Sequence, residues 1–165
     1  MSDGDSCRLK YFEGEPEVLA EVRQMWDEIF DDPEEFADYY FTEICKQNKI
    51  LLAYKGDVLA GMIHLNPYEM QVEGKKELCY YIVGVAVKPE YREQGIMHKM
   101  MQRVLADMKK DGRAFTFLMP EREEYYESLG FEKVFHTLEL DIDIAELEDE
   151  DVVPDDLSGE EGYYT

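Results

Sequence analysis

The sequence predicts a mixed α/β (α+β) domain, in which helices flank a central twisted sheet. Three observations lead to this fold class. The chain has 165 residues, which suits one domain. Apolar residues make up 45% of it and aromatic residues 13%, enough for a packed core. Two apolar segments, residues 78–87 and 114–119, enclose a helical pattern over residues 96–109, and this order predicts a sheet that is at least partly parallel.

The first part of the chain predicts one strand and two helices. Residues 8–12 suit a short strand. A helix should follow, because apolar side chains then recur at helical spacing. These positions are Val18, Val22, Met25, Trp26 and Ile29. Pro33 fits the first turn of a second helix with Asp32 as its cap, and that helix should run to about Cys45.

The middle of the chain predicts strands joined by tight turns. Residues 49–54 and 58–66 suit two strands with a turn at residues 55–57. Pro67 should interrupt the second strand, residues 68–72 should continue the sheet, and Lys75-Lys76 should mark another turn. Residues 78–87 then suit a central strand, and residues 114–119 a short buried one. A short helix over residues 121–129 should end at Gly130.

The C-terminal part predicts a final strand and an acidic tail. Residues 138–144 alternate strictly between apolar and polar, as in a half-buried strand. From Glu146 onward there are nine acidic residues and no basic one. We therefore expect a folded domain over residues 1–145 and a loosely held tail over residues 146–165.

Charge and composition exclude several classes of function. The net charge of −22 repels nucleic acid phosphates and anionic lipids and favours cationic partners such as amines, although it also serves solubility alone. No apolar run approaches the roughly 20 residues of a membrane span, and the polar start does not look like a signal peptide. The three cysteines form no CxxC pair. We expect a cytoplasmic protein with no membrane or nucleic acid partner, and no metal, because no ligand cluster has metal spacing.

A single glycine separates the strand over residues 78–87 from the helix over residues 96–109. The first turn of a helix leaves backbone N–H groups unpaired, and Gly95 lets a ligand approach them closely. Nearby charges are mixed: Lys88, Arg92 and Lys99 against Glu90 and Glu93. This arrangement suits a phosphate or pyrophosphate. The alternative is an ordinary strand–turn–helix, since the segment has neither a Walker A loop nor the Rossmann glycines.

Two longer motifs resemble the GNAT acetyltransferase superfamily. The strand Val85-Ala-Val87 followed by Arg92-Glu-Gln-Gly95-Ile-Met97 is similar to its coenzyme A motif, and Tyr126-Glu-Ser-Leu-Gly-Phe131 is similar to its downstream signature. The resemblance covers roughly residues 8 to 140 and is closest to the N-terminal domain of the enhanced-intracellular-survival type. Those chains are longer, and this one does not show their extended C-terminus, whose terminal carboxylate serves there as general base. Met97 also departs from the usual glycine or alanine.

The resemblance implies a function and the residues that perform it. The fold would be GNAT-like with a splayed strand pair, which Gly84 would help to open. The activity would be transfer of an acetyl group from acetyl-CoA to a primary amine by direct attack. The pantetheine arm would pair with the backbone of Val85, Ala86 and Val87. The amide of Val87 would stabilise the oxyanion, and Tyr126 would protonate the leaving thiolate. The pyrophosphate would bind the amides of Glu93, Gln94, Gly95, Ile96, Met97 and His98.

Several questions stay open at this stage. The general base is unassigned, and His64 and Glu69 are weak candidates. The acceptor is unidentified: Trp26, Phe30, Tyr39 and Tyr68 are candidates for an apolar pocket wall or, equally, for the core. A homodimer is left open. The alternative functions are a module that binds acyl-CoA without catalysis and an interaction protein that works through its acidic tail.

Overall fold

A computed structural model describes residues 6–134, and residues 6–131 of these belong to one compact unit. The strands are β1 (Cys7–Tyr11), β2 (Lys49–Lys55), β3 (Val58–Val72), β4 (Lys75–Val87) and β5 (Phe117–Leu118). The α-helices are α1 (Pro16–Ile29), α2 (Glu34–Tyr39), α3 (Ile96–Lys110) and α4 (Glu124–Glu127). Shorter turns are η2 (Tyr40–Ile44), η3 (Cys45–Gln47) and η4 (Pro89–Tyr91). The predicted strand over residues 138–144 and the boundary at residues 145/146 lie outside the described residues.

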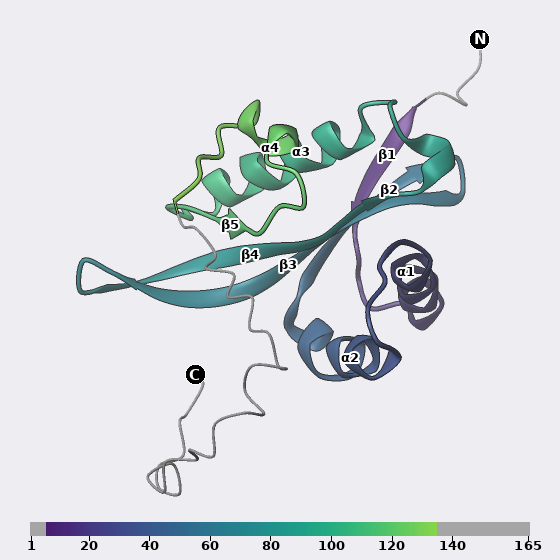
Figure 1. The fold of residues 1–165 in the computed structure, drawn as a ribbon, viewed down its shortest axis with the longest axis horizontal. Helices are drawn as coiled ribbons and strands as arrows, with labels where there is room; N and C mark the ends of the chain where they lie inside the picture. Colours follow the sequence, from purple (N-terminus) through teal and green to yellow (C-terminus); the bar gives the residue numbers. More distant parts are fainter. Residues whose placement is uncertain (1–5, 135–165) are drawn as a thin grey trace, which may run out of the picture. The chain divides into compact units, whose positions relative to one another are not determined.

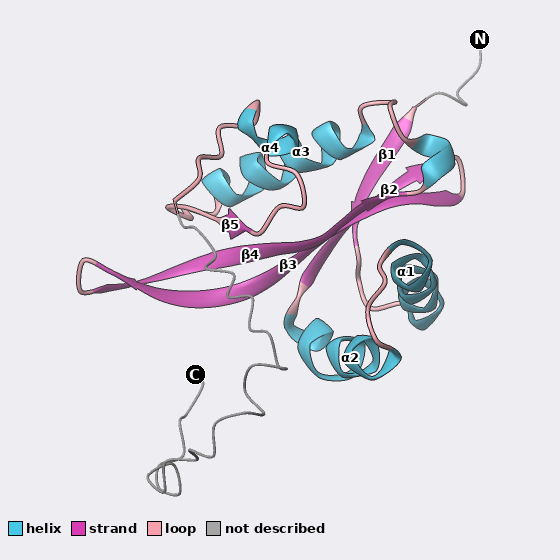
Figure 2. Cartoon of the chain, in the orientation of Figure 1, coloured by secondary structure: helices cyan, strands magenta, loops and turns pink. Residues whose placement is uncertain are grey.

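The five strands form one sheet in the order β1-β2-β3-β4-β5. The first three pairings are antiparallel and the pairing of β4 with β5 is parallel. Figure 1 and Figure 2 show α1 and α2 on one face of this sheet and α3 on the other. The predicted fold class, a mixed α/β sheet with flanking helices, is therefore confirmed.

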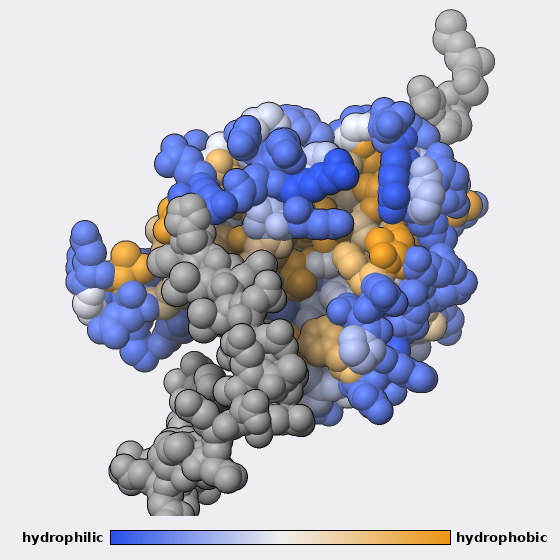
Figure 3. All heavy atoms as spheres, viewed as in Figure 1, coloured by the Kyte–Doolittle hydropathy of each residue, from blue (hydrophilic) through white to orange (hydrophobic). Residues whose placement is uncertain are grey.

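Two hydrophobic clusters, one on each face of the sheet, hold these layers together. Trp26 of α1 and Tyr40 at the end of α2 pack on one face with Met62 of β3. On the other face, Met100 and Val104 of α3 pack on the sheet. Burying one such side chain contributes about 1.5–3 kcal/mol, so these clusters dominate the stability of the domain. Hydrophilic residues predominate on the surface shown in Figure 3, as expected for a chain with 34% charged residues. Among residues 6–134, no helix has both the length and the apolar character to cross a membrane.

The predicted interruption at Pro67 is wrong, because β3 runs through this residue. Pro67 pairs with Tyr80, and the pairing of β2 with β3 has already ended at Leu65. The carbonyl of Tyr80 accepts a hydrogen bond from the Thr116 hydroxyl at 2.6 Å, on the side away from β3. In an antiparallel pair the backbone groups of the opposite residue, here Pro67, point away from the partner strand as well. The missing N–H of Pro67 therefore removes no bond of the ladder. The turn that follows lies at Glu73-Gly74, and Lys75 and Lys76 belong to β4.

The second helix is shorter than its apolar pattern predicts. The helix α2 has Pro33 at its cap position, and the chain continues as a π-helical turn, η2, and a 3-10 turn, η3. Asp32 does not cap the helix, because its carboxylate accepts a hydrogen bond from the Trp26 indole at 3.0 Å. Phe36, an apolar residue of this helix, is 48% exposed. π-helical turns occur often at functional sites, and this one positions Tyr40.

The predicted buried strand over residues 114–119 contains only the two paired residues of β5, which are half-buried. They pair with Tyr81 and Ile82 of β4. The strand is short because Met119, directly after it, is 78% exposed and Pro120 lacks an N–H donor. Beyond Ile82, the edge of β4 has no strand partner among residues 6–134, and this open edge adjoins the candidate site.

Candidate active site

The turn between β4 and α3 is held in a shape that only a few residue types adopt readily. Gly95 has φ +72° and precedes the first residue of α3, and Glu93 has φ +62° although it is not a glycine. The Arg92 guanidinium donates to the Val87 carbonyl at 3.1 Å, and the Gln94 amide donates to the Glu90 carbonyl at 3.3 Å. A left-handed non-glycine residue costs about 1–2 kcal/mol. Such strain occurs preferentially at ligand sites.

The backbone amides of residues 93–98 are unpaired within the described part of the chain. None of them donates to a backbone carbonyl or a side chain there. The side chains of Glu93, Gln94 and His98 are exposed, and a Cβ added at Gly95 would meet no atom within 4 Å. Free amides at the N-terminus of a fifteen-residue helix attract an anion through their N–H groups and the helix dipole. These residues therefore fit a diphosphate.

Met97, the departure from the family motif, points toward the protein core. Its side chain is partly buried and packs against the cluster between α3 and the sheet, as the buried side chain of Ile96 also does. The bulky residue therefore leaves the amides at the turn open.

The last residues of β4 direct backbone groups toward the open edge. Lys88 donates its amide to the Ala60 carbonyl of β3. Since the ladder alternates, the N–H and C=O of Val87 point away from β3, toward the open edge. The Arg92 bond to the Val87 carbonyl lies on this side. Val85 and Val87 pack on the α3 face, whereas Ala86 is buried on the α1 face. An extended ligand can add to this edge as a strand does.

Gly84 lies in a β-bulge at the start of the open edge. Met62 pairs with Ala86 and His64 pairs with Val83, so two residues of β4, Gly84 and Val85, oppose one residue of β3. Gly84 has φ +60°, and a Cβ there would lie 2.5 Å from the Trp26 ring and 3.1 Å from Cδ2 of His64. Glycine is thus required here both by the backbone and by the close approach of Trp26.

Tyr126 lies on α4 and is half-buried, whereas the neighbouring Tyr125 is 53% exposed. The Tyr126 ring packs edge-on against Phe131 at 5.9 Å and against the cluster on the α3 face. Burial, together with the nearby Glu121 carboxylate, raises the pKa of Tyr126 above its ordinary value. Its hydroxyl therefore stays protonated at neutral pH and can serve as a proton donor.

A buried polar network that the sequence did not predict lies on the opposite face of the sheet. Tyr40 is its centre: its hydroxyl donates to Asn66 Oδ1 at 3.1 Å and accepts from Asn48 Nδ2 at 3.0 Å. His64 Nδ1 lies 3.1 Å from the same oxygen. Because the single hydroxyl proton goes to Asn66, Nδ1 must carry a proton and donate it. His64 Nε2 is then a bare acceptor, and it has no partner among the described residues.

His64 is fully buried, and burial lowers its pKa to about 3. It therefore stays neutral and cannot hold a proton taken from a substrate at neutral pH, which argues against the weak assignment of His64 as general base. Glu69, the other candidate, is exposed on the outer part of β3, and its carboxylate pairs with Lys76 at 2.6 Å. Neither side chain is therefore a suitable general base.

The buried His64 predicts a pH-dependent stability. Its pKa rises from about 3 in the folded chain to about 6.5 in the unfolded chain, so between these pH values the unfolded state binds one more proton. Stability must then fall as the pH falls through this window. At pH 5 the His64 contribution should be about 2 kcal/mol less favourable than at pH 7.

Urea unfolding at both pH values measures this effect. The difference should largely disappear in His64→Gln, while His98→Gln, which replaces an exposed histidine, should retain it. An equal pH difference in the wild type and in His64→Gln would show that His64 titrates normally in the folded state.

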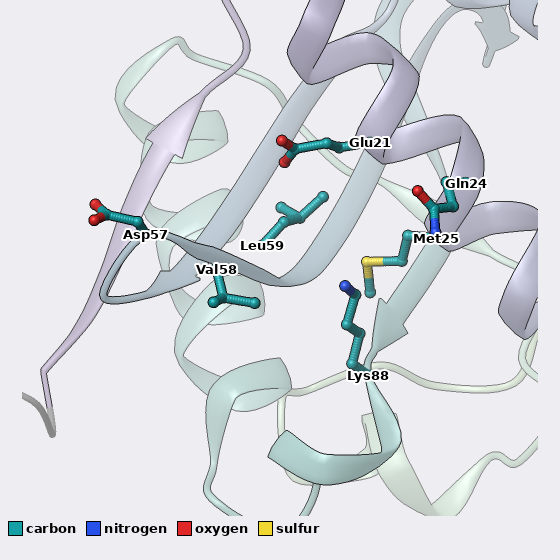
Figure 4. A pocket seen from close by; sticks show the side chains of 7 residues that line it. All are labelled: Glu21, Gln24, Met25, Asp57, Val58, Leu59 and Lys88. Carbon is teal, nitrogen blue, oxygen red and sulfur yellow. The ribbon is translucent and has the colours of Figure 1, made fainter.

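Two pockets lie on the face of the sheet that α1 and α2 cover. The first, of about 260 Å³, lies between α1 and the β2–β3 turn, and Lys88 from the end of β4 reaches into it beside Met25 (Figure 4). The second, of about 340 Å³, lies between α2 with its following turns and the outer part of β3. It includes Tyr39 and Tyr68, two of the aromatic residues considered for a pocket wall. Trp26 and Phe30, the other two, pack in the core.

The described residues contain no group of three or more His, Cys, Asp and Glu side chains that could hold a metal ion. Burial raises the pKa of Cys45 to about 11, so this thiol stays protonated beside His64. The chemistry available at the site is therefore that of backbone amides, a phenol and neutral polar side chains.

These features suit an acyltransferase: an open strand edge, free amides at a helix start and a half-buried phenol close in sequence to β5. The chain matches the family described as "Acetyltransferase (GNAT) domain" over residues 13–134. It belongs to this family of acetyltransferases. A comparison with curated protein sequences finds no match.

Solved structures share the fold at low sequence identity. A probable N-acyltransferase from Enterococcus faecalis is 22% identical with a TM-score of 0.70, over 77% of this chain and 32% of that one. A predicted acetyltransferase from Clostridium acetobutylicum, solved with acetyl-CoA, is 17% identical with a TM-score of 0.63, over 82% and 96%. Glucosamine-6-phosphate N-acetyltransferase from Arabidopsis thaliana is 14% identical with a TM-score of 0.62, over 84% and 99%. This chain thus spans about a third of the length of the Enterococcus protein.

Proposed function

We propose that this protein transfers an acetyl group from acetyl-CoA to a primary amine by direct attack of the amine on the thioester. The observation that carries this proposal is the row of unpaired amides from Glu93 to His98, next to the open edge of β4. A structural relative solved with acetyl-CoA supports the choice of donor. In this proposal the amides at the turn hold the pyrophosphate, and the backbone of Val85, Ala86 and Val87 pairs with the pantetheine arm.

The chain's own groups then perform three tasks. The Val87 N–H, on the open edge, stabilises negative charge on the thioester oxygen. The new C–N bond forms as the C–S bond breaks, and the Tyr126 hydroxyl gives its proton to the leaving sulfur. The proton of the acceptor amine leaves through water, because His64 stays neutral and the Glu69 carboxylate is paired with Lys76 on the outer part of the sheet.

The acceptor binds, in this proposal, in the larger pocket beside α2. Tyr68 lines that pocket and also packs against Tyr81 and Phe117, with ring centroids 6.1 and 5.7 Å apart. Tyr81 and Phe117 form the first of the two residue pairs between β4 and β5, and the strands part after the second. The pocket therefore adjoins the point where β4 and β5 part, and in this proposal the thioester enters the gap between these two strands.

We also propose a relation to the N-terminal domain of the enhanced-intracellular-survival type and a cytoplasmic location. The first is supported by the motif around Gly95 and by the greater length of the Enterococcus relative. The second is supported by the three cysteines, which are all free. A cationic acceptor is consistent with the net charge of −22.

A coenzyme A release assay with a panel of primary amines tests the proposed activity. We expect amine-dependent release of the free thiol and acetylated amine in equal amounts by mass spectrometry. Binding of acetyl-CoA without turnover on any amine would instead support the non-catalytic binding module. Absence of binding would exclude both functions.

A further inference from the structure

The pocket beside α2 has an unusual balance of charge. Its lining is aromatic and amide-rich, with the side chains of Tyr39, Glu43, Gln47, Asn48, Asn66 and Tyr68. Within the described residues, Glu43 is its one charged lining residue, and no lysine, arginine or histidine lines it. Glu43 also pairs with Lys46 at 3.3 Å, but Lys46 does not itself line the pocket.

The inner wall of the pocket belongs to the Tyr40 network. Asn48 and Asn66 line the pocket and also bond to the Tyr40 hydroxyl. Asn48 Oδ1 is buried and has no donor within the described part of the chain, and the same holds for His64 Nε2. Leaving a buried polar atom unpaired is unfavourable. Of these two residues only Asn48 lines the pocket, so its Oδ1 can accept an N–H or O–H donor from a ligand or a held water there.

The other unpaired acceptor, His64 Nε2, lies close to the bulge in β4. Cδ2 of His64, the ring carbon bonded to Nε2, is 3.1 Å from the Cβ position at Gly84. Gly84 lies in the bulge where the open edge of β4 begins. His64 is fully buried and does not line the pocket, so within this network it holds the Tyr40 hydroxyl behind the pocket wall.

We propose that the acceptor is a small amine without an anionic group, held by Asn48 Oδ1 beside the Glu43 carboxylate. This inference rests on the proposed acetyltransferase function and narrows its substrate class. A carboxylate or phosphate on the acceptor would find no cation in the lining, would lie near Glu43, and would leave Asn48 Oδ1 unpaired.

A matched pair of substrates tests this inference in the full-length protein. 6-Aminohexanamide and 6-aminohexanoate carry the same remote amine and differ only in an amide against a carboxylate. We expect kcat/KM for the amide to exceed that for the carboxylate by about tenfold at low salt. Glu43→Gln should reduce this preference to about threefold, whereas Glu35→Gln, an exposed change outside the lining, should preserve it.

Turnover of both substrates with equal kcat/KM would overturn the inference while leaving the acetyltransferase function intact. No coenzyme A release with any amine would overturn the proposed function itself. Asn48→Leu should raise the KM for 6-aminohexanamide and leave the KM for acetyl-CoA unchanged. A KM for the amine that does not change in this variant would also contradict the inference.

A second measurement does not depend on activity or on the variant's folding. In ¹⁵N NMR spectra of the wild type, saturating 6-aminohexanamide should shift the side-chain amide resonances of Asn48, because its Oδ1 gains a hydrogen bond. Asn48 resonances that do not respond to the amine would argue for a purely structural network.

Discussion

Replacing Tyr126 by phenylalanine should lower kcat by about 10²- to 10⁴-fold, the usual contribution of a positioned general acid. The change removes only the hydroxyl, so the ring contact with Phe131 and the fold should persist. Without its proton donor, the thiolate must leave unprotonated or take a proton from water. The KM for acetyl-CoA should change little, because in the proposed function backbone amides, and not Tyr126, hold this ligand.

The neighbouring tyrosine offers a matched control for this experiment. Tyr125→Phe removes the same atom from an exposed ring one residue away and should leave kcat unchanged. Continuous detection of the released thiol with a chromogenic reagent measures both variants. Full kcat in Tyr126→Phe would rule out this residue as the acid.

Replacing Gly84 by alanine should destabilise the domain by about 2–5 kcal/mol, for two separable reasons. A side chain at φ +60° costs about 1–2 kcal/mol. The new Cβ would also lie 2.5 Å from a Trp26 ring carbon, so the indole or the bulge must move. Overpacking of this kind typically costs a further 1–3 kcal/mol. Because Trp26 packs on His64 and Tyr40, the acceptor pocket should also change.

Gly112→Ala separates these two contributions. Gly112 has a similar φ of +71°, but a Cβ there would meet no atom within 4 Å. Urea unfolding at pH 7 should therefore give about 1–2 kcal/mol for Gly112→Ala and clearly more for Gly84→Ala. Equal costs would show that the close approach of Trp26 to Gly84 does not contribute.

The elements with strong periodic patterns could be predicted from the sequence. The apolar face of α3 and the continuous apolar run of β4 gave correct elements because burial on a fixed face requires those periods. Gly95 was correctly placed at the start of α3. The prediction at Pro67 was wrong because proline disfavours a strand only where its position needs an N–H donor. At Pro67 the edge of β3 that faces β2 has no partner, because the pairing of β2 with β3 ends at Leu65.

The polar network around Tyr40 could not be predicted in the same way. Asn48, His64 and Asn66 are separated along the chain from Tyr40, and only the pairing of β2 with β3 brings them to one place. The remaining signal in the sequence was the alternation of His64 and Asn66 within an apolar strand. It indicates two polar residues on one buried face but not their partner. The roles of Tyr126 and of residues 93–98 came from the family resemblance and stay predictions until tested.

A titration of ¹⁵N-labelled protein with coenzyme A, followed by backbone amide NMR, tests the central claim most directly. We expect saturable binding, with the largest shifts at the amides of residues 93–98 and at Val87. Failure to bind, or shifts confined to other segments, would contradict the claim that free amides around Gly95 hold a diphosphate.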